Sequence, residues 1–309
     1  MTVVCIYVTN VTARSVTAYA KGANGDVSPI QTISGSNTGL HVPQGIALDA
    51  GRNIYVANNS PAAVTVYAKG SHGNIAPMQI ITGSKTGLSF PEGIALDASL
   101  NIYIANSQGG YGLGSITIYA AGANGNVAPI RTIRGSNTGL NFPEGIILDS
   151  SRNIHVTNFP GGPSGLGSVN VYAAGANGNV APIRSISGST TALHGPVGIA
   201  LNRHGIIYVM NYGNPRRPGP GSVTVYDALA NGNVAPITTI SGSNTGLVGS
   251  LGIALGGSRR IYVANQQGGL SRLGSVTVYA PSANGNVAPI QTISGSKTQL
   301  RHPAGVAVR

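Results

Sequence analysis

The sequence predicts an all-β protein, a six-bladed β-propeller built from four-stranded antiparallel blades. Three observations predict this fold. The tract Ile-Tyr-Val-Ala-Asn, or a near copy of it, occurs six times. The copies recur about every 50 residues with no helical pattern between them, which is typical of a radial array of small sheets. The chain also begins and ends inside a repeat, so its two ends can complete one blade. The copies lie at residues 6–10, 54–58, 102–106, 154–158, 207–211 and 261–265.

Each repeat is interpreted as an antiparallel meander of four short strands, A to D. Strand A is small and branched, strand B carries the recurring tract, and strand C alternates Val-Thr-Val-Tyr as a pleated surface does. A tight turn joins C to D, with Asn-Gly in five copies and His72-Gly73 in the second, because these residues tolerate a positive φ. In the second repeat, the expected strands are A at 45–49, B at 53–58, C at 63–68 and D at 75–82.

Strand D is expected at the outer rim, because it contains a proline in every copy and proline cannot donate to a sheet ladder. An exposed edge also benefits from such a block against aggregation. Strand A is then innermost, where the six sheets crowd together. The prolines are Pro29, Pro77, Pro129, Pro182, Pro236 and Pro289.

The whole chain is expected to form one domain, since a repeat array is one unit whatever its length. Residues 305–309 form a sixth strand A, whereas residues 2–10 begin with a strand B. The C-terminal strand is therefore expected to complete the N-terminal blade and close the ring. The expected blades are 305–309 plus 1–40, 43–88, 91–140, 143–193, 196–247 and 250–300.

The repeated pattern Pro-x-Gly-Ile-Ala-Leu-Asp, followed by Asn-Ile-Tyr-Val-Ala-Asn, resembles NHL-type and YVTN-type propeller repeats over essentially the whole chain. Strand B ends in Asn where NHL repeats often have Asp, which moves the pattern toward YVTN. The resemblance implies the fold, but these repeats occur in enzymes, sensors and adhesive surface proteins alike. It also favours a secreted or cell-surface setting, and residues 1–10 carry no recognisable signal peptide.

Composition sets broad limits on function. The chain has 18 Lys and Arg but only 7 Asp and Glu, for a net charge of +11. Such a balance attracts polyanions weakly, but the bases are spread over both faces and the rim, so nucleic acid is not an expected partner. No apolar run approaches the roughly 20 residues that cross a bilayer. Cys5 is the only cysteine, which excludes an internal disulfide. We expect a monomer.

Residues that recur in every copy are expected to serve the fold, so function should lie where one copy departs from the others. Of the 13 tyrosines, five fall in strand B and six in strand C, where they are expected to pack between blades. The asparagine that ends strand B is expected to bond to backbone. His155 replaces the strand-B tyrosine of its blade and is expected to be a packing variant.

The first departure concerns the loops between strands B and C. These B–C loops are short in blades 1 and 2 and long and glycine-rich in blades 3 to 6, at 107–114, 159–167, 212–221 and 266–274. Long loops on a rigid scaffold commonly carry binding sites. Their aromatic rings and arginines can stack on sugars or aromatic groups and pair with acids, or the rings can simply fill gaps. The candidate ligand-binding residues are Tyr111, Phe159, Tyr212, Arg216, Arg217, Arg272 and, from the channel, Gln44.

The second departure is the residue that precedes the strand-A glycine. Around the ring a polar arc is followed by an apolar arc, at one mouth of the central channel. Glu92 and Glu144 belong to neighbouring blades. Two carboxylates there can hold a calcium or magnesium ion or divide acid and base roles, or they can be solvated loop side chains. The six residues are Gln44, Glu92, Glu144, Val197, Leu251 and Ala304.

Two functions compete. The leading hypothesis is a non-catalytic recognition propeller that binds a glycan, peptide or small molecule through the long-looped face. The alternative is a metal-assisted hydrolase or lyase at the channel mouth. Resemblance to lactonase-like propellers implies a divalent ion held by Glu, Asn and Asp, and a virginiamycin-lyase-like propeller implies His and Glu. Neither full motif is present, because the axial aspartate is missing and the Pro-Glu-Gly order differs. No other cofactor is predicted, and the catalytic candidates are Glu92, Glu144, His41 and His302.

Overall fold

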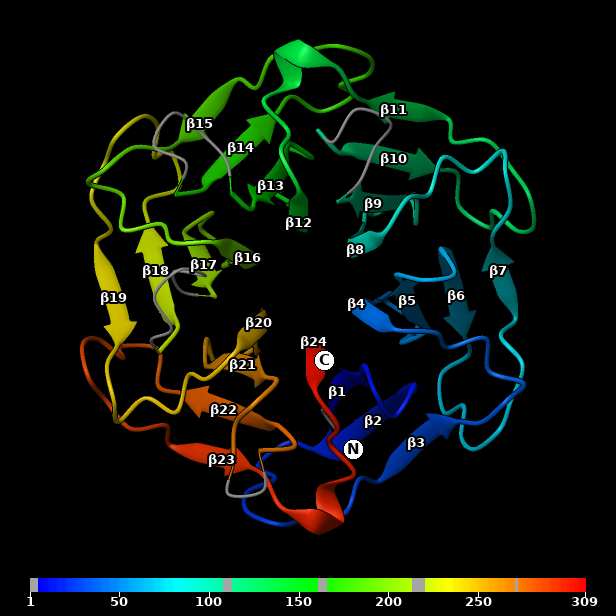
Figure 1. Cartoon of the computed structure of the whole chain (residues 1–309), viewed down its shortest axis with the longest axis vertical. Helices are drawn as coiled ribbons and strands as arrows, with labels where there is room; N and C mark the ends of the chain where they lie inside the picture. Colours follow the sequence, from blue (N-terminus) through cyan, green and yellow to red (C-terminus); the bar gives the residue numbers. More distant parts are fainter. Residues whose placement is uncertain (1–4, 108–112, 161–165, 213–219, 270–271) are drawn as a thin grey trace.

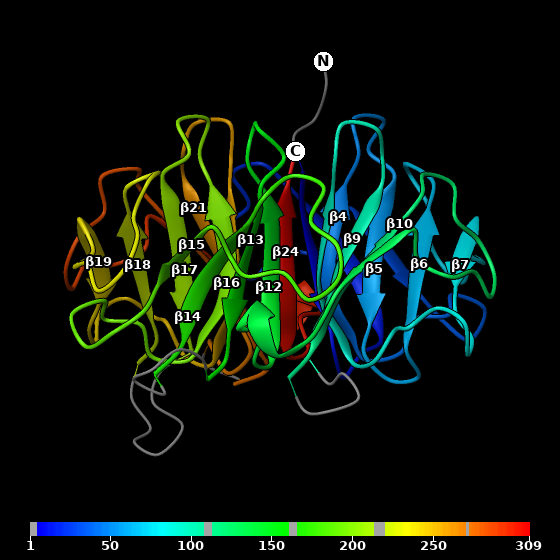
Figure 2. The same cartoon turned by 90° about the horizontal axis from the view of Figure 1, so that it is seen from above.

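The protein is a six-bladed β-propeller. In the computed structural model, which describes residues 5–107, 113–160, 166–212, 220–269 and 272–309, six four-stranded antiparallel sheets form a ring (Figure 1). Figure 2 shows this disc from its edge, with the strands running between its two faces. The predicted fold class is therefore confirmed.

In each blade the strands follow chain order from the axis outward, except in the blade that joins the two termini. The innermost strands are β4 (Pro43–Leu48), β8 (Pro91–Leu96), β12 (Pro143–Leu148), β16 (Pro196–Leu201), β20 (Ser250–Leu255) and β24 (Pro303–Val308). The second strands are β1 (Cys5–Asn10), β5 (Ile54–Asn58), β9 (Ile102–Asn106), β13 (Ile154–Asn158), β17 (Ile207–Asn211) and β21 (Ile261–Asn265).

The outer half of each blade is built in the same way. The third strands are β2 (Ser15–Ala20), β6 (Ala63–Tyr67), β10 (Ser115–Tyr119), β14 (Ser168–Tyr172), β18 (Ser222–Tyr226) and β22 (Ser275–Tyr279). The outer strands are β3 (Gln31–Ser34), β7 (Gln79–Ile81), β11 (Arg131–Ile133), β15 (Arg184–Ile186), β19 (Thr238–Ser241) and β23 (Gln291–Ile293). Two single 3-10 turns, η1 (Ser136–Thr138) and η2 (Ser296–Thr298), complete the elements, and among the described residues no helix has the length and apolarity to span a membrane.

The ring closes as the sequence predicts. Strand β24 pairs antiparallel with β1, so the last strand of the chain completes the first blade (Figure 1). Val306 pairs with Val8, and Val308 pairs with Ile6. The backbone of Cys5 exchanges two further hydrogen bonds with Arg309, at 2.8 and 3.1 Å.

The predicted bounds of two strands are wrong. Strand D of the second blade is β7, only Gln79–Ile81, and Pro77 precedes it instead of lying within it. The proline lacks an N–H, and ladder pairing with strand C begins only beyond it. Strand A begins earlier than expected, at Pro43, because this proline already faces Asn58 in the ladder.

The turn between strands C and D does more than reverse the chain, because it also docks on the preceding blade. Gly125 donates its N–H to the carbonyl of Ile80 at 2.7 Å, and Asn124 Oδ1 accepts from the N–H of Ile80 at 2.9 Å. Asn126 Oδ1 accepts from the N–H of Lys85 at 2.8 Å. Equivalent bridges of this turn to the preceding outer strand recur at all six blade junctions. The outer edge is therefore partly covered by the next blade.

The recurring tyrosines and asparagines serve the fold, as predicted. The buried Tyr67 of strand C donates its hydroxyl to the carbonyl of Thr38 in the preceding blade at 2.5 Å. The buried Asn58 at the end of strand B accepts from the N–H of His41 at 3.0 Å and donates to Thr65 Oγ1 at 3.0 Å. Side chains repeated in the sequence thus hold neighbouring blades and their connections together.

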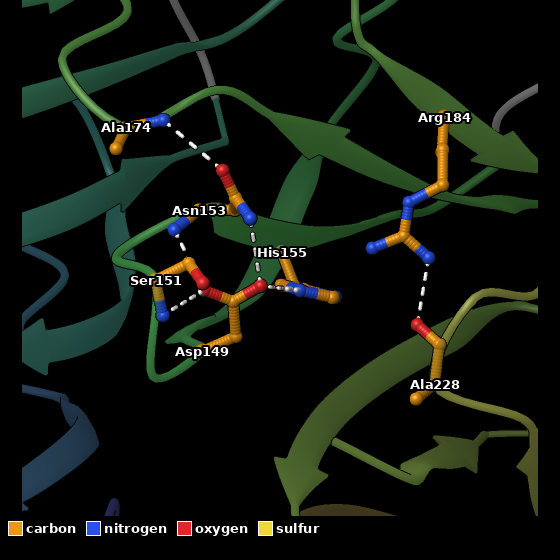
Figure 3. Close-up of polar contacts among 7 residues, drawn as sticks. All are labelled: Asp149, Ser151, Asn153, His155, Ala174, Arg184 and Ala228. Atoms are coloured by element: carbon orange, nitrogen blue, oxygen red, sulfur yellow. Dashed lines mark hydrogen bonds and ion pairs between the residues drawn. The ribbon is translucent and has the colours of Figure 1, made fainter.

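His155 takes the place and the partner of the strand-B tyrosine. Tyr103 donates its hydroxyl to Asp97 Oδ2 at 3.3 Å, whereas His155 Nε2 lies 3.4 Å from Asp149 Oδ2 (Figure 3). The ring is buried, which lowers its pKa, and its Nδ1 has no hydrogen-bond partner among the described residues. The expected packing role therefore carries an unsatisfied polar atom.

Replacing this histidine by tyrosine is expected to stabilise the protein. An unsatisfied buried nitrogen costs about 1 kcal/mol or more, so His155→Tyr should raise the free energy of unfolding by about that amount at pH 7.5. The folded-state pKa of His155 lies below its ordinary value of 6.5, so the native protein loses stability as the pH falls below that value, and the gain should widen there. Urea unfolding at pH 7.5 and at pH 5.5 measures the gain in the free energy of unfolding at each pH. The variant His155→Phe, which has no hydroxyl group, is the control. A gain that shrinks on acidification would contradict the expectation.

Candidate functional site

A ring of six glycines brings the innermost strands into backbone contact around the axis. A methyl group on Gly93 would overlap the backbone carbonyl oxygen of Glu144 in the next blade, and the same overlap recurs at every junction. Only glycine therefore fits at this position. The ring is formed by Gly45, Gly93, Gly145, Gly198, Gly252 and Gly305.

A β-bulge turns the residue before each glycine toward the channel. In the third blade Pro91 pairs with Asn106 and Ile94 with Ile104, so strand A has one residue more than strand B between these pairs. Such a bulge bends the strand and re-aims a side chain. The same shift occurs in all six innermost ladders.

The six bulge residues and six glycines line one cavity of about 90 Å³. Its volume equals that of about three liquid waters. Gln44, Glu92 and Glu144 occupy three consecutive blades, and Val197, Leu251 and Ala304 occupy the other three. The structure thus places the polar arc and the apolar arc around one small space at the channel mouth.

The two glutamates are half-buried and face no opposite charge among the described residues. Glu92 Oε1 accepts a hydrogen bond from Asn59 Nδ2 at 2.5 Å, whereas the carboxyl group of Glu144 has no hydrogen-bond partner in the described part of the chain. Neither glutamate takes part in an ion pair with a described residue. Burial raises the pKa of Glu144 to about 7. Burial, and then the neighbouring Glu144, raise the pKa of Glu92 well above its ordinary value, against the opposing effect of Asn59.

Threonine hydroxyls fix the cavity wall on two opposite blades. Thr157 Oγ1 accepts from the N–H of Gly145 at 2.8 Å and donates to the carbonyl of Val197 at 2.6 Å. Thr9 makes the same pair of bonds with Gly305 and Gln44. The other four blades have Ala or Met at this place in strand B. These hydroxyls anchor the bulge and hold its side chain in position.

The histidine candidates lie away from this cavity. His41 lines a separate space of about 240 Å³, together with Arg14, and His302 Nδ1 lies 3.1 Å from Thr12 Oγ1. Within the described ranges, no group of three or more His, Cys, Asp or Glu side chains is placed to hold a metal ion. The two glutamates are brought together, but the histidines do not join them. A divalent cation stays a prediction.

The described loop candidates extend the apolar arc outward. Phe159 and Tyr212 are half-buried and pack against the hydrophobic cluster that contains Val197. The side chain of Arg272 is exposed, and its backbone φ is 53°. The remaining loop candidates, Tyr111, Arg216 and Arg217, lie outside the described residues.

Phe90 and Phe142 flank the two glutamates and were not among the sequence candidates. They lie two residues before Glu92 and Glu144, on the face that carries the B–C loops, and are 41% and 37% exposed. Their φ angles are 50° and 45°, which is rare for a bulky residue, and unfavourable before a proline. With Phe159 they are the only phenylalanines of the chain. All three lie in connections at the same face, and this common location in the repeat was the sequence signal that could have identified Phe90 and Phe142.

Asn59 was also not predicted, because it lies in one of the short B–C loops and the sequence candidates were taken from the long ones.

We call the face that carries the B–C loops and the connections between blades the B–C face. Strand pairing of Pro43 with Asn58 places the start of strand A and the end of strand B together at this face. The cavity residues, which follow the first residue of each strand A, therefore lie toward this face.

Comparison with known proteins supports the fold and no more. No protein-family model and no curated protein matches the chain. A protein of unknown function from Bacteroides caccae has a TM-score of 0.67 at 10% identity, over 99% of this chain and 99% of its own. A protein from Lactobacillus plantarum has a TM-score of 0.58 at 14% identity, over 100% of both. A streptogramin B lyase has a TM-score of 0.57 at 14% identity, over 97% of this chain and 82% of its own.

Proposed function

We propose that this propeller is a recognition module that binds an extended ligand across its B–C face without transforming it. The observation that carries the proposal is the cavity at the channel mouth, where an acidic arc and an apolar arc meet beside the exposed Phe90 and Phe142. Rigid aromatic rings and a few convergent polar groups are the usual elements of a recognition surface. A glycan, a peptide or a small molecule offers the matching groups.

The size of the cavity supports surface recognition over full enclosure. At about 90 Å³ it is well below the roughly 300 Å³ at which sites for drug-sized ligands begin. A ligand therefore inserts only an end group and lies mostly on the face. Phe90 and Phe142 present exposed rings there, and the long loops of blades 3 to 6, including Phe159, Tyr212 and Arg272, form the surroundings.

The test removes the exposed rings and leaves the backbone unstrained. Asparagine tolerates the left-handed conformation. The double variant Phe90→Asn, Phe142→Asn should therefore fold normally and weaken binding at least tenfold. The probes are a printed glycan array and a lysine-scanned peptide array, and binding of the strongest hit is measured by titration calorimetry.

A matched control removes equally exposed apolar side chains from the rim. Ile130 and Ile183 are 54% and 53% exposed beside the outer strands. The variant Ile130→Asn, Ile183→Asn should bind like the native protein. Equal binding by both double variants, or no hit on either array, would refute the proposed function.

A second candidate is acid–base catalysis by a metal-assisted hydrolase or lyase at the same mouth. One observation favours it, since burial brings the pKa of Glu144 to about 7, close to the value that suits a general acid or base at neutral pH. Metal analysis of the purified protein tests the metal-assisted version. Under this candidate Glu144→Gln abolishes turnover of a bound hit, whereas the recognition proposal expects no turnover in the native protein.

The repeat pattern supports a further proposal, that the chain belongs to the NHL or YVTN repeat class. The Pro-x-Gly-Ile-Ala-Leu-Asp signature, which gives the channel glycine its place, supports this assignment. Under it, a secreted or cell-surface location and a monomeric state are the expected setting for recognition.

A further inference from the structure

We propose that the channel-mouth cavity receives a primary ammonium group on an unbranched alkyl chain, carried as the lysine side chain of a peptide. The inference rests on the proposed recognition function and names the end group that enters the mouth. The chain has only two glutamates, and both line this one cavity on neighbouring blades.

The polar arc supplies enough acceptors for an ammonium group. An ammonium group has three N–H donors and no acceptor. Glu92, Glu144 and Gln44 lie on three consecutive blades and all line the cavity. The half-buried carboxyl group of Glu144 has no hydrogen-bond partner among the described residues, and Glu92 has only Asn59. Neighbouring carboxylates held partly out of water without a cation are destabilising, and a bound ammonium group lowers that cost.

The net charge of the chain supports the interpretation of this cavity as a cation-binding site. The chain carries +11, with 18 basic and only 7 acidic side chains. Even so, the described residues place no Lys, Arg or His side chain in an ion pair with either glutamate. A pair that served only to balance charge within the fold would be expected to contact one of these bases. The two carboxyl groups are therefore suited to a cation from another molecule.

The apolar arc suits the stem of the ligand. Val197, Leu251 and Ala304 face the glutamates across the cavity and offer aliphatic contact to methylene groups. The volume of about 90 Å³ holds an ammonium group and about two methylenes. The remaining stem then emerges on the B–C face, beside the exposed Phe90 and Phe142.

The same geometry disfavours other cations. A guanidinium group is a rigid planar fork with five N–H donors, whereas an ammonium group is compact and can turn its three donors toward the oxygens of a cavity of about 90 Å³. Calcium requires six to eight oxygen ligands and magnesium six in a regular octahedron, whereas the two carboxyl groups and one amide of the arc offer at most five side-chain oxygens. Selectivity for lysine over arginine therefore follows from the size and shape of the cation, and selectivity over divalent ions follows from the number of oxygen ligands.

The test uses small probes with the whole protein at pH 8 and low salt. Nα-acetyl-lysine methylamide, Nα-acetyl-arginine methylamide, n-butylammonium, n-butanol, calcium and magnesium are titrated by calorimetry, with thermal shift as a second readout. The lysine derivative should bind at least tenfold more tightly than the arginine derivative, and n-butylammonium at least tenfold more tightly than n-butanol. The variant Glu92→Gln, Glu144→Gln should lose at least tenfold in affinity for both ammonium probes.

Several results would overturn the inference. These are equal binding of the lysine and arginine probes, ammonium binding that survives the double glutamine change, or a divalent ion that binds more tightly than any ammonium. Binding of n-butylammonium more tightly than Nα-acetyl-lysine methylamide would overturn the peptide source. Should an array hit still depend on Phe90 and Phe142 while no ammonium probe binds, the recognition function stands and this inference fails.

Discussion

Deletion of residues 305–309 is expected to destabilise the ring strongly. These residues form most of β24, the innermost strand of the first blade, where Val306 is buried and pairs with Val8. Their loss removes the ladder to β1 and the backbone contact between Gly305 and Gln44. Ladder bonds at about 1 kcal/mol each and buried aliphatic area together amount to about 5–8 kcal/mol. That is comparable to the whole stability of a typical domain.

Thermal unfolding followed by circular dichroism measures the effect, and the melting temperature should fall by more than 10 °C, which corresponds to several kcal/mol for a chain of this length. The control is a circular permutant that begins at residue 43 and joins Arg309 to Cys5 through a short linker. Their backbones already exchange two hydrogen bonds. The permutant keeps every strand and should melt within a few degrees of the native chain. An unchanged melting temperature after the deletion would mean that ring closure contributes little.

The fold could be predicted from the sequence because each blade repeats the same local pattern. The Ile-Tyr-Val-Ala-Asn tract and the half-blades at the two termini predicted the number of blades and the closing strand. The outer strand was predicted too long, because the segment around Pro77 looks extended in sequence but does not pair. The docking of Asn124 and Asn126 on the preceding blade was also not foreseen. This docking depends on a contact between blades. The sequence did not reveal it, because the local turn already accounts for the Asn-Gly pair.

The channel-mouth residues could be predicted because one glycine per repeat fixed their positions. Gln44, Glu92 and Glu144 were found by reading one place around the ring, and the structure puts all three on one cavity. Asn59 could not be found in this way, because it contacts Glu92 from the neighbouring blade and from a short loop. The histidines were selected by residue type alone. The cavity geometry excludes His41 and His302 from its lining.

Replacing Glu144 by glutamine is expected to stabilise the protein at alkaline pH and not at acidic pH. Burial raises the folded-state pKa of Glu144 from 4.5 to about 7. Below pH 4.5 the group is protonated in both the folded and the unfolded chain, so it favours neither. Between about pH 4.5 and pH 7 the unfolded chain loses this proton while the folded chain keeps it, so stability falls over that range and the full loss is present above pH 7. The shift corresponds to about 2–3 kcal/mol once residual solvation in the channel is allowed for.

Glu144→Gln keeps the shape of the side chain and removes the ionisation, so at pH 8.5 it should raise the melting temperature by about 4 °C, with little change at pH 4.5. The reverse change in the same ring, Gln44→Glu, adds a third carboxyl group to the cavity and should lower the melting temperature at pH 8.5. Apart from the two glutamates, no lining side chain titrates, so the two variants isolate the charge of this cavity. A pH-independent gain for Glu144→Gln would indicate improved packing instead. A native protein that retains both glutamates at a cost in stability is consistent with a site kept for binding and not for the fold.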